Sequence, residues 1–130
     1  MGKYIKKAQI AIEFVLLVSV TFIILLIFLK AIGDQADDLN EKKEFILVKD
    51  LAYKAQYEIN IASQVKSGYN RTFFIPEKLD NNDYTITKIE NKITIGLKNS
   101  EFTITIPDVN GSIKKGNNTI KNIGGVIYIN

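Results

Sequence analysis

The segment KKAQIAIEFVLLVSVTFIILLIFLK, residues 6–30, decides the fold of this chain. From Phe14 to Leu29 it holds 16 consecutive residues without a charge. A helix needs about 20 apolar residues to cross a bilayer, and the run approaches that length when it is counted from Gln9. Glu13 does not suit a plain anchor, because a carboxylate costs roughly 2.5–3.5 kcal/mol at mid-membrane, although less near the end of a span.

The charges that flank this run predict its orientation. Three lysines precede it, namely Lys3, Lys6 and Lys7, and three aspartates follow it closely, namely Asp34, Asp37 and Asp38. Positive residues stay on the cytoplasmic side of a single span. We therefore expect a single-pass topology with the N-terminus in the cytoplasm and about the last 100 residues outside.

The composition excludes several classes of function. Three of the 17 basic residues lie in residues 1–8, which leaves 14 basic and 14 acidic residues in the remainder. A nucleic-acid interface needs a clustered basic surface, so we expect no nucleic acid partner. The chain has no cysteine and no histidine, which excludes disulfides, thiol catalysis, Cys/His zinc sites and histidine base catalysis. We expect no enzyme activity, no cofactor and no metal.

Three interpretations of the N-terminal segment compete. A secretory signal peptide would end at the small-x-small site Ala31-Ile32-Gly33, but Glu13 would then have no role. A simple single-span anchor would hold Glu13 at the headgroup level. The third interpretation treats the leader, Glu13 and the apolar run as one functional unit.

The stretch KKAQIAIEF resembles the processing site of archaeal type IV pilin-like proteins, which carry a class III (prepilin) signal peptide. In that family a basic leader ends in a small residue, often Gly, and the mature chain begins with Gln and has Glu at its fifth position. The matching residues here are Lys6, Lys7, Ala8, Gln9, Glu13 and Phe14. Ala8 stands where Gly is common, and Ala11 stands where Ser is frequent. The resemblance covers about 25 residues.

The resemblance implies that a prepilin peptidase cleaves between Ala8 and Gln9 on the cytoplasmic side, so the apolar segment stays on the mature protein. That segment first anchors the subunit in the membrane and then packs in the core of a filament. Glu13, one helical turn from the new Gln9 amine, could pair with that amine in the next subunit and set the assembly register. The implied partners are the peptidase, copies of the chain or sister pilins, an assembly ATPase and a membrane platform protein.

Beyond the membrane the helical pattern continues to about Lys66, with Gly33 as a weak point where the helix could bend. One apolar stripe follows helical spacing: Val48, Ala52, Ala55, Ile59 and Ala62. The sequence thus predicts four segments. They are a leader at 1–8, a hydrophobic transmembrane and assembly helix at 9–30, an amphipathic continuation at 31–67 and an extracellular antiparallel β domain at 68–130.

After Ser67-Gly68-Tyr69-Asn70 the periodicity changes to that of strands. We expect strands at 72–75, 84–89, 92–97, 101–106 and 126–129, in a small antiparallel sheet packed on the Val48–Ala62 stripe. Glu90-Asn91 is a candidate two-residue turn, with Asn91 able to adopt positive φ. Lys98-Asn99-Ser100 is the next turn, and 109–121 is expected to form a further hairpin.

Three Asn-x-Ser/Thr sequons are candidate N-glycosylation sites, at Asn70, Asn110 and Asn117, and all fall in predicted turns. Asn-rich turns beside Ser or Thr would give the same pattern without modification. Asp80-Asn81-Asn82-Asp83 lacks the Gly and distal Glu of a calcium loop and is better explained as a polar turn. The aspartates after the apolar run are better explained as a solvated acidic collar than as a metal site.

We therefore expect an α+β protein with a long N-terminal helix, apolar in its first half and amphipathic in its second. The expected function is that of a structural subunit of an extracellular type IV pilus-like filament, with a use in surface adhesion. The alternative is a single-span membrane-anchored protein that displays a small β-rich binding module and never assembles.

Overall fold

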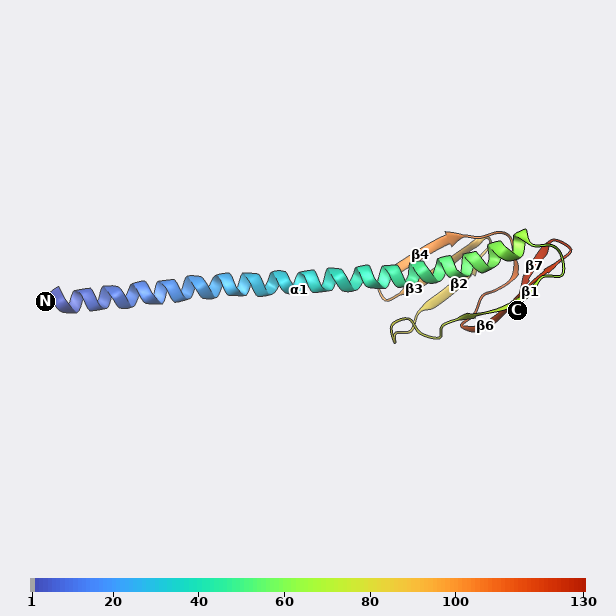
Figure 1. Ribbon diagram of the computed structural model, residues 1–130. Coiled ribbons are helices and arrows are strands. Elements are labelled where there is room, and N and C mark those ends of the chain that lie inside the picture. Colours follow the sequence, from blue (N-terminus) through green and yellow to red (C-terminus); the bar gives the residue numbers. More distant parts are fainter. Residues whose placement is uncertain (1) are drawn as a thin grey trace. The chain divides into compact units, whose positions relative to one another are not determined.

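The computed structural model describes the backbone of residues 2–130 and the side chains of residues 7–130. Its first element is the helix α1, Gly2–Gln64 (Figure 1). The helix continues through Gly33, where the sequence allows a bend. The chain divides into two compact units, Met1–Leu39 and Asn40–Asn130, and α1 contributes to both. The fold class is α+β, as the sequence predicts.

The first unit is apolar helix without cover from its own chain. All of its described residues from Lys7 to Leu39 are exposed. Ser19 and Thr21 are the two polar residues of the uncharged run 14–29, and both bond within the helix. Ser19 Oγ donates to Val15 O at 2.7 Å, and Thr21 Oγ1 donates to Leu17 O at 2.8 Å. A hydroxyl that bonds one turn back is suited to an apolar environment. The segment is therefore compatible with lipid or with neighbouring apolar helices.

The second unit adds strands to the last part of α1. The strands are β1 Asn70–Ile75, β2 Thr85–Ile89, β3 Lys92–Leu97, β4 Ser100–Thr105, β5 Asn110–Gly111, β6 Gly116–Ile123 and β7 Val126–Ile129. They form two sheets and not the single antiparallel sheet that the sequence predicts. One sheet has the order β1-β6-β7-β5, with β5 parallel to β7, and the other has the order β2-β3-β4.

The expected hairpin at 109–121 is wrong. β5 pairs with β7, whereas β6 lies between β1 and β7. The physical reason is Gly111, which has φ +100° and lies so close to β7 that an added Cβ would be 2.0 Å from Ile129 O. The dipeptide Asn110-Gly111, which lies within the expected hairpin and is of a type common in turns, therefore marks a close approach of two strands and not a hairpin turn.

The hairpins β2–β3 and β3–β4 are present with the expected antiparallel pairing. Their turns differ in detail from the prediction. Glu90, and not Asn91, is the residue with positive φ, at 51°, and Lys98 repeats this value in the next turn. Ser100 lies in β4 and not in the connection, so this turn has two residues.

The core of the second unit forms where the helix stripe meets both sheets. The predicted stripe is confirmed, because Val48, Ala52, Ala55, Ile59 and Ala62 are all 0% exposed. The side chains that cover it from the sheets are also fully buried: Ile93, Ile95, Leu97 and Ile120. Each buried Ile or Leu of this core stabilises the fold by about 1.5–3 kcal/mol.

Asn122 joins the C-terminal end of α1 to β6. Its side chain is 2% exposed, and its Nδ2 donates to Ala62 O at 2.9 Å and to Val65 O at 3.0 Å. Carbonyls at a helix end have no partner within the helix. Asn122 Oδ1 accepts from Gly125 N at 3.0 Å, so both the nitrogen and the oxygen of the side-chain amide are hydrogen-bonded. The helix therefore ends where β6 supplies this amide.

Replacing Asn122 by Ala should lower the free energy of unfolding by about 1–3 kcal/mol, because buried carbonyls lose their donor. Asn122→Asp should cost more, since a carboxylate would face the negative end of the helix. A urea titration of the full chain in detergent micelles, followed by tyrosine fluorescence, measures this. The exposed Asn99→Ala is the control. Equal stability of Asn122→Ala and Asn99→Ala would contradict the capping role.

Candidate functional site

The candidate processing site lies at the start of α1. Lys7, Ala8 and Gln9 are exposed helical residues, so the Ala8–Gln9 bond is covered by no other described part of the chain. The side chains of Lys3 and Lys6, which complete the predicted basic leader, lie outside the described residues. Cleavage at Ala8–Gln9 and the leader role of the lysines stay predictions.

Gln9 and Glu13 lie on the same face of α1. Gln9 Nε2 donates to Glu13 Oε1 at 3.3 Å, and both side chains are exposed. Side chains on a helix lean toward its N-terminus, so the Glu13 carboxylate is directed toward the backbone of Gln9. A charged amine formed at Gln9 by cleavage would thus lie within one turn of a carboxylate.

The surface that follows is apolar on all sides. An 18-residue window of α1 has a mean hydropathy of 2.9, and none of that window is buried in the chain. Phe14, which completes the predicted assembly motif, is 66% exposed, and 17 large apolar side chains between Ile10 and Ile32 are at least 46% exposed. A surface of this kind marks a contact with lipid or with other proteins.

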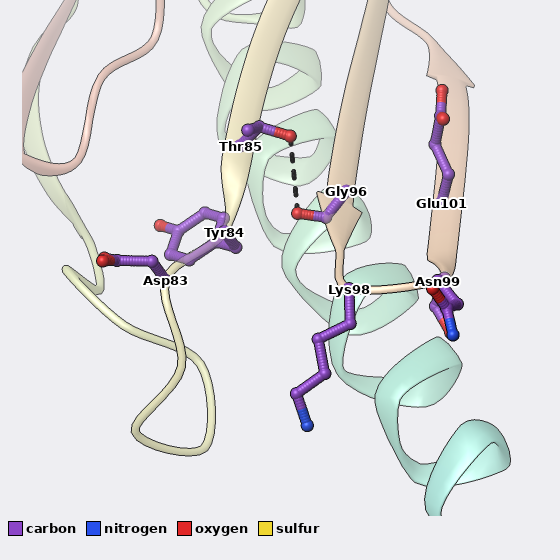
Figure 2. A pocket seen from close by; sticks show the side chains of 8 residues that line it. Asp83, Tyr84, Thr85, Gly96, Lys98, Asn99 and Glu101 are labelled. Carbon is purple, nitrogen blue, oxygen red and sulfur yellow. Dashed lines mark hydrogen bonds between the residues drawn. The ribbon is translucent and has the colours of Figure 1, made fainter.

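A shallow hollow of about 340 Å³ lies in the second unit, beside the start of β2 and the turn between β3 and β4 (Figure 2). Its charged residues do not converge. Figure 2 shows Asp83, Lys98 and Glu101 with side chains that point in different directions. Lys98 Nζ lies 2.6 Å from Glu44 Oε1, which neutralises it. Within the described residues the hollow offers no paired acid and base aimed at a common point.

Three pKa shifts in the second unit report contacts between its elements. Burial, and then the Glu77 carboxylate, raise the pKa of Tyr84 to about 12, and its hydroxyl donates to Pro76 O. The Lys43 ammonium, 2.8 Å away, lowers the pKa of the Asp80 carboxyl by hydrogen bonding and charge. Lys43 on the helix thus pairs with the loop before β2.

The third shift belongs to a pair between α1 and β1. The Tyr69 side chain, and then the Glu58 carboxylate, raise the pKa of the Arg71 guanidinium. Arg71 Nη2 lies 3.3 Å from Glu58 Oε1, while Glu58 is 6% exposed and its Oε2 is buried without a partner among the described residues. A half-satisfied buried carboxylate is costly, so removal of Arg71 alone should be strongly destabilising.

The structure also places the remaining candidates. Asn70 begins β1, Asn110 lies in β5 and Asn117 lies in β6, so the sequons lie in strands and not in the turns that the sequence predicts. Asp80 and Asn81 form a tight polar turn, closed by pairing of Leu79 with Asn82. No group of three or more metal-ligating side chains occurs between residues 7 and 130.

Sequence reasoning missed the structural contacts of Asn122, which binds the end of α1, and of Glu58, which pairs with Arg71. Asn122 is a polar residue at an inward position of β6, and Glu58 interrupts the apolar side of the helix. Both are polar residues where the period predicts a buried one, which is the signal that could have identified them.

No family model, no curated protein and no solved structure matches this chain. What the structure shows is a long apolar N-terminal helix followed by small β-sheets, which is a pilin-like architecture.

The Tyr84 shift predicts a loss of stability at high pH. Its folded pKa of about 12 lies above the ordinary value of 10.0, so its contribution is complete below pH 10 and is lost as the pH rises through about 12. Solvent screening limits the effect to roughly 1–2 kcal/mol. Urea titrations of the full chain at pH 9 and pH 11.5 measure it.

Tyr84→Phe should lose less stability than the wild type over the same interval, while the exposed Tyr57→Phe should behave as the wild type does. An equal loss in Tyr84→Phe and wild type would show that another group governs the alkaline transition.

Proposed function

We propose that this chain is a structural subunit of an extracellular type IV pilus-like filament, anchored in the membrane before assembly, with a use in surface adhesion. The observation that carries the proposal is the uncovered apolar helix that begins directly after the Gln9–Glu13 pair. This combination matches the class III signal peptide that the sequence resembles.

The exposed apolar surface of α1 is too costly in free energy to remain in water, so it requires a partner. Covering 17 half-exposed large side chains is worth on the order of 20 kcal/mol, at about 1 kcal/mol for each. A domain of this size has a total stability of about 5–15 kcal/mol. The segment therefore needs lipid before assembly and other helices afterwards. A pilin meets these two environments, first in the membrane and then in the filament.

Glu13 gives the assembly its register. After cleavage the Gln9 amine carries a positive charge, and an unpaired charge among apolar helices costs several kcal/mol. Glu13 lies one turn from that amine, on the same face. Pairing of Glu13 with the Gln9 amine of the adjacent subunit neutralises both charges at one axial position only, and sliding by a turn would lose this contact between subunits and leave only the pairing within each chain.

The proposal implies a sequence of partners. A prepilin peptidase removes residues 1–8 at the cytoplasmic face, and an assembly ATPase with a membrane platform protein moves the subunit from the bilayer into the filament. Copies of this chain or sister pilins then take the place of lipid. The role is structural and not enzymatic, with the second unit displayed outside the cell.

Glu13→Ala should leave processing intact and reduce filaments at least tenfold, because the Gln9 amine loses its partner. Filament mass sheared from cells and seen by electron microscopy measures assembly, and the mass of the N-terminal peptide measures processing. Asp38→Ala, an exposed helical acid outside the motif, is the control.

Glu13→Gln separates charge from size and should fail as Glu13→Ala does. Wild-type filament yield in both variants would refute the register role. A chain that stays in the membrane as a processed or unprocessed monomer, with no filaments in the wild type, would favour the alternative of a single-span protein displaying a β-rich binding module.

A further inference from the structure

The three sequon asparagines come together on one face of the four-stranded sheet. The pairing register places Asn70 of β1 opposite Lys121 of β6, Lys121 opposite Tyr128 of β7, and Tyr128 beside Asn110 of β5. All four residues are exposed, whereas the alternate positions Ile120, Ile127 and Ile129 are buried. The row therefore runs across the outward face, with Asn70 and Asn110 at its two ends.

Asn117 lies on the same face. It pairs with the exposed Phe74 and stands four residues before Lys121 on β6, an even spacing that keeps it on one side of the strand. Strands lie about 4.8 Å apart and rise about 3.4 Å per residue, so any two of the three asparagines are about 14–17 Å apart. That spacing leaves room for a separate group on each.

Three nearby asparagines that are not the acceptor residue of a sequon have structural roles: two lie in β6 and one follows β7. Asn118 is 0% exposed and binds Lys114 O and Gly116 O, Asn122 holds the end of α1, and Asn130 Nδ2 donates to Ser112 O. The side chains of Asn70, Asn110 and Asn117 make no hydrogen bond to any residue in the range 7–130. The three sequon side-chain amides are thus exposed and free of hydrogen bonds to the residues 7–130, unlike those of Asn118, Asn122 and Asn130.

The hydroxyl that completes a sequon is also on this face at two of the sites. In a strand, residues i and i+2 share a side, so Thr72 accompanies Asn70 and Thr119 accompanies Asn117. The Thr72 and Thr119 hydroxyls lie 3.4 Å apart, which confirms their common side. An enzyme approaching this face meets both the amide and the hydroxyl of the motif.

We propose that the outward face of the β1-β6-β7-β5 sheet is a glycan-bearing surface with N-linked sugars at Asn70, Asn110 and Asn117. The inference rests on the proposed function in one respect, namely that this unit lies outside the cell. The donor is an oligosaccharide linked to a membrane lipid phosphate. Asparagine Nδ2 forms a bond to the anomeric carbon, the bond from that carbon to the phosphate oxygen breaks, the lipid phosphate leaves with the electron pair, and one amide proton is released.

A consequence for assembly follows from the position of the three sites. Sugars at both ends of the row, with a third four residues along β6 from Lys121, would cover Lys121 and Tyr128 and keep this face out of contacts between subunits. The subunit contacts of the second unit would then use its other surfaces, and the sheet face would form part of the filament exterior.

Peptide mass spectrometry of the chain recovered from its native cells tests the modification. Each of the three sequon peptides should carry a sugar mass, and Asn70→Gln, Asn110→Gln and Asn117→Gln should each remove one. Thr72→Val should also remove the group at Asn70, whereas Thr72→Ser should keep it. Asn99→Gln, an exposed asparagine outside any sequon, should change nothing. Unmodified sequon peptides in the wild type would overturn the proposal.

Labelling with an amine-reactive reagent tests the common face. Lys121 should react at least several-fold less in the wild type than in the triple Asn→Gln variant, while Lys54, exposed on the helix, should react equally in both. Equal labelling of Lys121 would contradict a shared surface. A chain that starts at Gln9 without sugars would refute this inference alone, and a chain that starts at Met1 with sugars would refute only the filament proposal.

Discussion

The structure depends on one constraint: the first part of α1 has an apolar surface that its own chain does not cover. Backbone polar groups in such a setting have to be satisfied internally, which a continuous helix achieves. Ser19 and Thr21 satisfy their hydroxyls in the same way, by bonding to carbonyls one turn back. Against this background Glu13 is the exception, and its neighbour Gln9 is the residue that cleavage would charge.

The second part of α1 differs, because here the chain's own strands cover the apolar side of the helix. A stripe of small and branched residues faces two sheets, and polar contacts fix their positions. Asn122 binds the last carbonyls of the helix, while Arg71 pairs with the buried Glu58. The exposed pairs, such as Lys43 with Asp80, contribute little stability individually and serve mainly to orient loops.

Much of this fold could be predicted from the sequence, because it depends on periodicity. The apolar run, the stripe from Val48 to Ala62 and the hairpins around β3 all follow from spacing alone. The division into two sheets could not be predicted in this way, since it depends on long-range pairing of β1 with β6. The Asn110-Gly111 pair was equally ambiguous, because the same dipeptide serves a hairpin turn or a close strand contact.

The features of the candidate site also divide into those that a local motif predicts and those that depend on long-range pairing. Gln9 and Glu13 were identified by their place in a local motif, and the structure adds their shared face. The sequons were visible as motifs, but only the sheet register shows that Asn70, Asn110 and Asn117 share one surface. Asn122 was not identified, since an inward-facing asparagine has no meaning until the helix end that it binds is known.

The most direct test of the account is the N-terminal residue of the protein recovered from its native cells, determined by mass spectrometry of the first peptide with allowance for cyclised Gln. If the chain is a pilin-like subunit, its mature form begins at Gln9 and keeps the apolar segment. A chain that begins at Met1, or one that begins near Asp34 without the segment, would contradict a pilin-like role.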